Sequence, residues 1–313
     1  MRKTSSIGLS LMGFLLCTAE ARASNLLANH ATRCGDDLTH SIPPRSAAAL
    51  LGSDFVQRLS GLNDDEREGA ILEQLLAGNI PTFLRHLTPV HLTQHAGQRQ
   101  ADEVTVCVAP DYLAVGSDQN FFLVPMRLRT ALTVASRFRF ALPTPRIVDA
   151  IYAQAVTHLH PQTLPPSDTM RTTAYYWEHN ELVQQQRSDL TAVLGALTAG
   201  DKKDLVLTNR LWSFPDRVAI YGWHRQDGTP IQPLSTVHGA RYADYSHGVR
   251  LVSATAYIDG KAVPFLTLLQ DPRVAPLLSD EGQIRNVAGL MNTLKAQAMP
   301  VTQALRTSSR DDH

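Results

Sequence analysis

The side chains able to do chemistry are densest between residues 238 and 250. This stretch combines imidazole, carboxylate, hydroxyl, phenol and guanidinium groups and leads directly into an apolar, β-branched run. Imidazole exchanges protons near neutral pH, and loops at the ends of rigid strands commonly carry catalytic groups. The pattern predicts acid–base catalysis, with His247 as base or acid and with Asp244 or Tyr245 orienting it. The predicted catalytic residues are His238, Asp244, Tyr245, Ser246 and His247.

Other polar and aromatic side chains are candidates for holding a substrate. Arg250 suits a carboxylate or an oxyanion, because guanidinium binds such groups in a bidentate manner. A charged group at 201–204 and Arg210 flank a predicted strand, and Tyr221-Gly222-Trp223-His224 follows another. The predicted substrate-binding residues are Lys203, Asp204, Arg210, His224, Tyr242 and Arg250. The alternatives are a solvated charge run, a core Trp223 and a purely structural turn at 238–250.

A zinc site is a second chemistry that these residue types allow. Zinc accepts imidazole and carboxylate ligands, and His238, Asp244 and His247, with His224 as a further ligand, are the candidates. Their spacing does not match a compact motif such as His-Glu-x-x-His. We therefore predict no metal ligand and no cofactor, and keep zinc as the alternative.

The segment Ser246-His247-Gly248, followed by Arg250, resembles the Ser-His-Gly-Cys-x-Arg motif of L,D-transpeptidase catalytic domains, which cross-link peptidoglycan. His238-Gly239 is similar to the upstream His-Gly of that family. Val249 stands where the family has its nucleophilic Cys, and Arg250 comes one residue early. The resemblance points to the cell envelope, while the missing Cys excludes a Cys-based transpeptidase.

The longer stretch from residue 202 to 282 resembles an uncharacterised group of secreted bacterial proteins. The shared phrases are Lys-Lys-Asp-x-Val, Tyr-Gly-Trp-His, Pro-Ile-Gln-Pro-Leu, Asp-Tyr-Ser-His-Gly and Leu-Ser-Asp-Glu-Gly. This resemblance implies secretion and no particular activity.

These residues must be positioned by helices and strands that do not alternate strictly along the chain. This order predicts an α+β fold. We expect a single globular body with an antiparallel or mixed sheet. Apolar spacing, caps and turn residues predict helices over 64–77, 130–138, 180–199 and 284–305, and a further helix that begins at Pro145. They predict strands over 104–108, 204–207, 218–221 and 249–258, with a hairpin turn at Asp259-Gly260.

The chain divides into three predicted parts. Residues 1–23 have the layout of a signal peptide: Arg2 and Lys3, then a short apolar run, then the small-x-small site Ala21-Arg22-Ala23. Residues 24–62 are expected to form an irregular lead, and residues 63–313 an α+β domain. A Pro-rich connector at 158–173 is the only predicted internal boundary.

Composition limits the partners and the compartment. Lys+Arg and Asp+Glu are both 29, and no basic stripe supports nucleic-acid binding. No apolar segment reaches the roughly 20 residues that a membrane span needs. After the signal peptide is removed, Cys34 and Cys107 remain, and in an oxidising compartment two cysteines predict one disulfide. Two unpaired buried thiols are the alternative.

Together these features predict a secreted or periplasmic hydrolase or lyase that acts on a cell-wall polymer, either peptidoglycan or another glycan. Its partner is that polymer or a small-molecule substrate. The alternative is a non-catalytic protein that binds or assembles envelope components, which the missing nucleophile favours.

Overall fold

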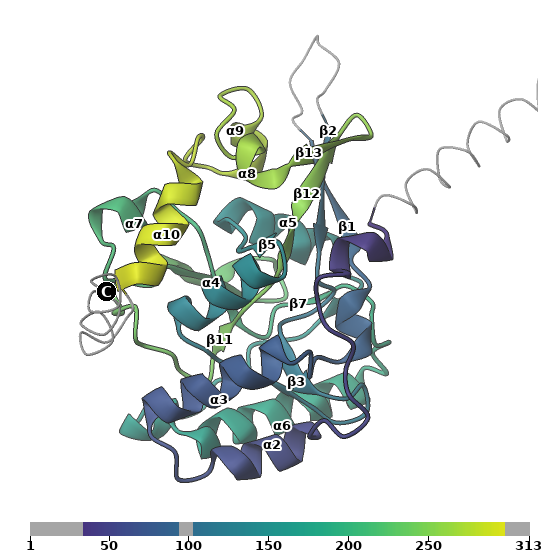
Figure 1. Cartoon of the computed structure of the whole chain (residues 1–313), viewed down its shortest axis with the longest axis vertical. Coiled ribbons are helices and arrows are strands. Elements are labelled where there is room, and N and C mark those ends of the chain that lie inside the picture. The colour runs from purple at the N-terminus through teal and green to yellow at the C-terminus, as the bar shows by residue number, and fades with distance from the viewer. Residues whose placement is uncertain (1–33, 94–102, 298–313) are drawn as a thin grey trace, which may run out of the picture.

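The structure, a computed structural model, describes residues 34–93 and 103–297 (Figure 1). The predicted signal peptide lies outside these residues. The α-helices are α2 (Gly52–Leu59), α3 (Asp64–Leu76), α4 (Leu128–Arg137), α5 (Pro145–Gln154), α6 (Thr173–Asp189), α7 (Arg210–Ser213), α8 (Phe265–Leu268), α9 (Ala275–Leu278) and α10 (Val287–Gln297). Three 3-10 helices in the described ranges are η1 (Asp36–Thr39), η2 (Thr82–Arg85) and η3 (Asp168–Arg171).

The strands form a larger sheet, a smaller sheet and two short pairs. The larger sheet has the order β1 (Thr88–Thr93), β2 (Glu103–Val108), β12 (Val252–Ile258) and β13 (Lys261–Pro264), with β5 (Phe140–Ala141) also paired to β12. The smaller sheet has the order β10 (Pro230–Ser235), β9 (Ile220–His224), β8 (Lys203–Leu205) and β11 (His247–Gly248). The short pairs are β3 (Ala114–Gly116) with β4 (Phe121–Leu123), and β6 (Thr157–His158) with β7 (Thr198–Ala199). Mostly antiparallel sheets, with helices that do not alternate strictly with the strands, confirm the α+β class.

Several elements begin and end where their sequence signals predict. Asn63 caps α3 with a capping box that includes Glu66. Thr144 caps α5, whose first residue is Pro145. The β12–β13 hairpin turns at Asp259-Gly260, where both residues have positive φ, as a two-residue turn of the primed type requires.

Two predicted segments differ in the structure. The expected irregular lead contains α2, which buries Phe55 and Leu59; no side chain caps this helix, so the usual start signal is missing. The helix expected over 180–199 is α6, and it is shifted toward the N-terminus. It begins after Thr172, whose side chain accepts a hydrogen bond from the Tyr175 amide, and it ends at Asp189.

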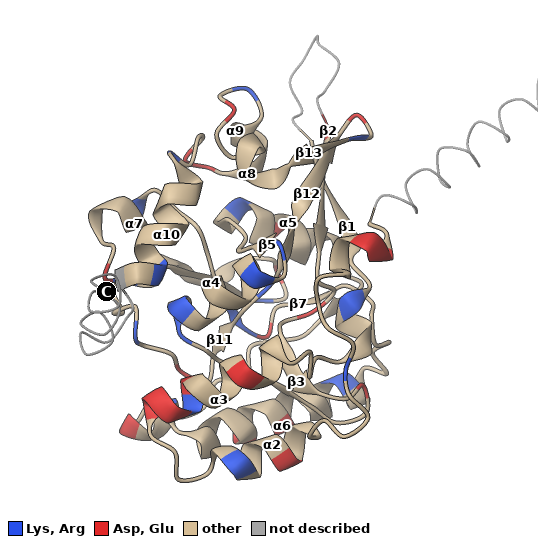
Figure 2. Ribbon diagram, in the orientation of Figure 1, with Lys and Arg blue, Asp and Glu red and all other residues tan. Residues whose placement is uncertain are grey.

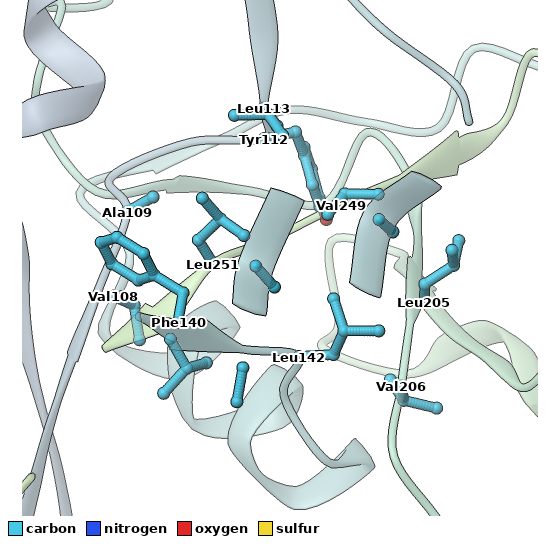
Figure 3. Packing of buried hydrophobic residues seen from close by; sticks show 14 of the residues in the cluster. Val108, Ala109, Tyr112, Leu113, Phe140, Leu142, Leu205, Val206, Val249 and Leu251 are labelled. Atoms are coloured by element: carbon cyan, nitrogen blue, oxygen red, sulfur yellow. The ribbon is translucent and has the colours of Figure 1, made fainter. Parts of the chain in front are cut away.

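One hydrophobic core connects both sheets and the helices. Leu159 and Leu164, from the Pro-rich connector, belong to the same cluster as residues on either side of it, so the described residues form one body. Val249 and Leu251 lie inside this cluster, close to Leu142 and Leu205 (Figure 3). The segment that joins β11 to β12 is therefore anchored on apolar neighbours.

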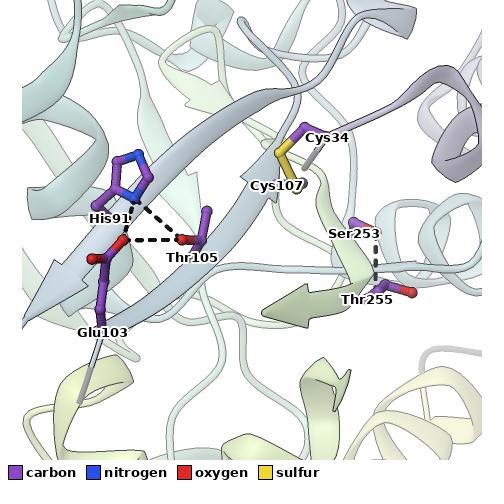
Figure 4. Close-up of a disulfide and its surroundings, with 7 residues drawn as sticks. All are labelled: Cys34, His91, Glu103, Thr105, Cys107, Ser253 and Thr255. Atoms are coloured by element: carbon purple, nitrogen blue, oxygen red, sulfur yellow. Dashed lines mark hydrogen bonds and ion pairs between the residues drawn. A yellow bond between two sulfur atoms is a disulfide. The ribbon is translucent and has the colours of Figure 1, made fainter. Parts of the chain in front are cut away.

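The predicted disulfide is confirmed in the structure. Cys34 and Cys107 are bonded, with a Cα–Cα distance of 5.5 Å (Figure 4). The bond ties the start of the described chain to β2, the central strand next to β12. No helix in the described ranges is long and apolar enough to cross a membrane.

Candidate functional site

The short parallel pair β8–β11 brings the two predicted polar segments together. Lys203 lies opposite His247 and Asp204 lies opposite Gly248, and the Lys203 amide donates to the Ser246 carbonyl at 2.7 Å. Side chains alternate between the two faces of a strand. Lys203 and His247 therefore share one face of the pair, and Asp204 lies on the opposite face.

We call the first side the histidine face, formed by Lys203, His238, Tyr242, Asp244, Ser246 and His247. Asp244 lies at its centre and accepts hydrogen bonds from the Ser246 amide (2.9 Å), the Ser246 hydroxyl and the Tyr242 phenol (3.0 Å). Burial alone would raise the pKa of Asp244, but His247, the bonds from Ser246 and the nearby Lys203 ammonium outweigh it and lower the pKa to about 2. Asp244 is therefore a stable buried anion at neutral pH.

His247 is the least satisfied member of this face. It is 1% exposed, and neither ring nitrogen has a hydrogen-bond partner among the described residues. Burial lowers its pKa to about 4 despite the opposing charge of Asp244, so the imidazole is neutral at pH 7. A buried polar group without a partner is costly, and its retention calls for an explanation such as a role in binding or catalysis.

This face reaches the surface through three half-buried side chains, those of His238, Tyr242 and Lys203. The His238 ring stacks on the Tyr242 ring at 4.0 Å with an interplanar angle of 7°, and it lies 6.4 Å from the His247 ring. Burial lowers the pKa of His238, which favours its neutral form. The Lys203 ammonium lies 4.8 Å from the Trp223 ring, and Trp223 has a strained backbone with φ of 58°.

Two predicted catalytic residues bond elsewhere. The Tyr245 hydroxyl accepts from the Leu164 amide (3.0 Å) and donates to the Leu164 carbonyl (3.3 Å), so it holds the connector rather than His247. Ser246 donates its hydroxyl proton to Asp244 and not to His247. The order of contacts in a Ser-His-Asp relay, in which the imidazole lies between the other two, is therefore not found here.

The opposite side, which we call the arginine face, consists of Tyr112, Asp204 and Arg250. Arg250 is fully buried and donates to the carbonyls of Ala109 (3.0 Å) and Thr198 (2.7 Å). Its guanidinium carbon lies 4.3 Å from the Tyr112 ring centre, and the Tyr112 hydroxyl donates to Asp204 at 2.8 Å. Burial raises the pKa of Asp204 to about 7. These groups hold strands together and present no exposed surface to a ligand.

The remaining predicted residues lie in other local networks. Arg210 is exposed at the start of α7 and donates to the Leu234 carbonyl at 2.9 Å. His224 bonds to Asp149 at 2.9 Å and stacks on Tyr152 at 4.5 Å. Across residues 34–93 and 103–297, no group of three or more His, Cys, Asp or Glu side chains is placed to hold a metal ion.

Sequence reasoning missed Arg171 and Tyr112. The Arg171 guanidinium carbon lies 5.4 Å from the Tyr242 ring centre, which places a cation at the edge of the histidine face. Both residues are distant in sequence from the polar stretch, and their neighbouring sequence carries no motif. Comparisons of this chain with protein-family models, with curated proteins and with solved structures each returned no match.

Proposed function

We propose that this chain is an exported acid–base enzyme, a hydrolase or lyase that acts on a cell-envelope polymer at the histidine face. The observation that carries the proposal is the buried His247 ring, neutral and without a partner on either nitrogen, beside the ionised Asp244. A neutral imidazole accepts a proton, and a neighbouring carboxylate stabilises the imidazolium that forms.

The half-buried residues of the histidine face would bind the substrate. His238 and Tyr242 form a flat, partly exposed stack on which a sugar ring or another planar group can pack. The Lys203 ammonium attracts an anionic group of the substrate. In hydrolysis, a proton passes from the attacking water to His247 as the scissile bond breaks, and the imidazolium returns it to the departing oxygen. In a lyase reaction, a proton passes from a substrate carbon to His247 as the bond to the leaving group breaks, and that group takes the proton from the imidazolium. Asp244 stabilises the imidazolium in both cases.

Export supports the envelope setting. The N-terminal residues have the pattern of a cleavable signal peptide, and a disulfide such as Cys34–Cys107 persists in oxidising compartments and is rare in the cytosol. The mature chain in this proposal works in the periplasm or outside the cell.

The test is product formation by the purified mature chain. The protein is incubated with peptidoglycan and with other envelope glycans, and new fragments are identified by mass spectrometry over time. We expect His247→Gln to lower the rate by roughly a hundredfold or more, because general acid–base catalysis contributes about that much. The matched control is His86→Gln, the same change at a histidine that is 62% exposed, and its rate should match the parent's.

A fully active, folded His247→Gln protein would exclude His247 from the chemistry. Failure of the parent protein to release fragments from any of these polymers would reject the enzyme proposal as a whole.

A second candidate is a non-catalytic protein that binds or assembles envelope components. It is favoured by the burial of His247 and by the hydrogen bonds that already engage both oxygens of Asp244. In this case the same polymers are retained by the immobilised protein and no fragments appear. Retention without products after prolonged incubation decides for this candidate.

A further inference from the structure

A cavity of about 400 Å³ lies next to the histidine face, between α3, α4 and the segment 240–241. Its polar lining consists mainly of Asp65, Glu68, Arg127, Arg129, Thr130 and Arg241. Binding pockets for small ligands have volumes of roughly 300–1,000 Å³, so one sugar unit fits. In Figure 2 the first turn of α3 is red and α4 carries blue segments.

The two carboxylates of the cavity are already engaged. Asp65 accepts two hydrogen bonds of 2.7 Å from Arg241 and also pairs with Arg127, and these bonds lower its pKa. Both oxygens of Glu68 accept from the Arg127 amide at 3.1 Å, and one also accepts from the Thr130 hydroxyl. Burial raises the pKa of Glu68, which favours its neutral form. Neither acid is left to repel an incoming anion strongly.

The guanidinium groups of the lining, in contrast, are not all paired with carboxylates. The guanidinium groups of Arg127 and Arg241 pair with Asp65, and Arg129 adds a third guanidinium to the lining. With two carboxylates and three guanidiniums, the lining carries at least one excess positive charge. In the described part of the chain, the Arg129 guanidinium has no hydrogen-bond or ion-pair partner, whereas its main-chain carbonyl accepts a hydrogen bond from the Thr133 hydroxyl. A guanidinium group whose N–H donors are free in a cavity can bind a carboxylate or phosphate group in a bidentate manner.

The cavity and the histidine face are neighbours. Arg241, which lines the cavity, precedes Tyr242 of the histidine face, and Arg171 contacts both the Tyr242 ring and Asp64 at the start of α3. A polymer bound across residues 240–242 therefore reaches both places with adjacent units.

We propose that this cavity binds an anionic sugar unit of the polymer, next to the unit processed at the histidine face. The anion is a carboxylate or a phosphate on the sugar, and Arg129 is its principal ligand. The identity of the polymer rests on the proposed function, whereas the binding of an anionic sugar does not require turnover.

The experiment is calorimetric titration of the mature chain with three probes of similar size: trigalacturonate, maltotriose and maltotriose phosphate. We expect the carboxylated or the phosphorylated sugar to bind at least tenfold more tightly than neutral maltotriose, a difference of about 1.4 kcal/mol. The ranking of the two anions identifies the preferred group. Equal affinity for all three probes, or binding of none, overturns the inference.

The variant Arg129→Gln should weaken binding of the preferred anion about tenfold, as expected for a lost charge-assisted contact. The matched control is Arg137→Gln, on the same helix but exposed and outside the cavity lining, and its affinity should equal the parent's. Unchanged affinity of a folded Arg129→Gln protein overturns the inference.

Failure of the two proposals can be told apart. Anion binding that depends on Arg129, in a protein that releases no fragments from any polymer, keeps the cavity assignment and rejects the enzyme. Fragment release that depends on His247, with the affinity and KM of Arg129→Gln unchanged, keeps the enzyme and rejects the cavity assignment.

Discussion

The two faces of the β8–β11 pair use the same kinds of residue with opposite results. Each has a tyrosine that donates to a buried aspartate: Tyr242 to Asp244 on the histidine face, and Tyr112 to Asp204 on the arginine face. Asp244 receives two further hydrogen bonds from Ser246 and has a pKa of about 2. Asp204 has one oxygen without a partner in the described structure, and its pKa is about 7.

The difference shows that burial alone does not set the charge of a carboxylate. Desolvation is the first cause acting on both aspartates. At Asp244 the charges of His247 and Lys203 and the bonds from Ser246 outweigh it. At Asp204 the charge of Arg250 and the bond from Tyr112 do not. The faces also differ in access. His238 and Tyr242 are half-buried, whereas Arg250 is fully enclosed by backbone carbonyls and Tyr112. These differences support the structural role that we infer for the arginine face and the chemical role that we propose for the histidine face.

The largest effect is expected from Arg250→Met. The change keeps much of the volume but leaves the Ala109 and Thr198 carbonyls without their donor, and breaking up a buried charged group typically costs about 3–5 kcal/mol. Urea denaturation measures the loss in unfolding free energy. Arg137→Met, at an exposed position, is the control and should stay within about 0.5 kcal/mol of the parent. A loss below about 1 kcal/mol for Arg250→Met would contradict the structural assignment.

The sequence predicted those parts of the fold whose signals are local. Asn63, Pro145 and Asp259-Gly260 mark boundaries through their own backbone preferences and nearest neighbours, so no distant partner is needed to recognise them. Helix α2 was not predicted, because it has no side-chain cap and depends on burial of its apolar side against elements that are distant in the sequence.

The site was predicted only in outline for a related reason. The stretch 238–250 identified most of the histidine face, but the stretch itself does not reveal that Arg250 points into the core. The bond from Tyr112 to Asp204 joins residues 92 positions apart, and the parallel pairing of β8 with β11 is equally non-local. Such contacts depend on the whole topology, so local sequence patterns do not encode them.

The second prediction concerns pH. The contributions of the two faces to the unfolding free energy should change with pH in opposite directions. The pKa of Asp204 is raised from 3.8 to about 7 on folding, so its protonated form stabilises the fold at low pH and that stability is lost as pH rises from 4 to 7. The pKa of His247 is lowered from 6.5 to about 4, so its stability is present above pH 6.5 and is lost as pH falls toward 4.

Urea denaturation from pH 4 to pH 8 tests this with Asp204→Asn and His247→Gln. Relative to the parent, Asp204→Asn should gain stability as pH rises and His247→Gln should gain as pH falls, each by on the order of 3 kcal/mol across its window. Asp54→Asn is a control, since that side chain is exposed. Parallel pH profiles for the parent and either buried-site variant would remove the contrast between the faces.

The smallest and most selective test removes the matched hydroxyls with Tyr112→Phe and Tyr242→Phe. The Tyr112 bond is fully buried, and without it Asp204 loses its only side-chain donor among the described residues, so we expect a loss of about 1–2 kcal/mol in unfolding free energy. Asp244 keeps both bonds from Ser246, and the half-buried Tyr242 ring keeps its stacking on His238, so that variant should lose only about 0.5 kcal/mol. Fragment release should reverse the order, falling in Tyr242→Phe and not in Tyr112→Phe. If stability falls more in Tyr242→Phe, or activity falls more in Tyr112→Phe, the roles assigned to the two faces are wrong, because these variants differ only in which face loses its phenolic proton.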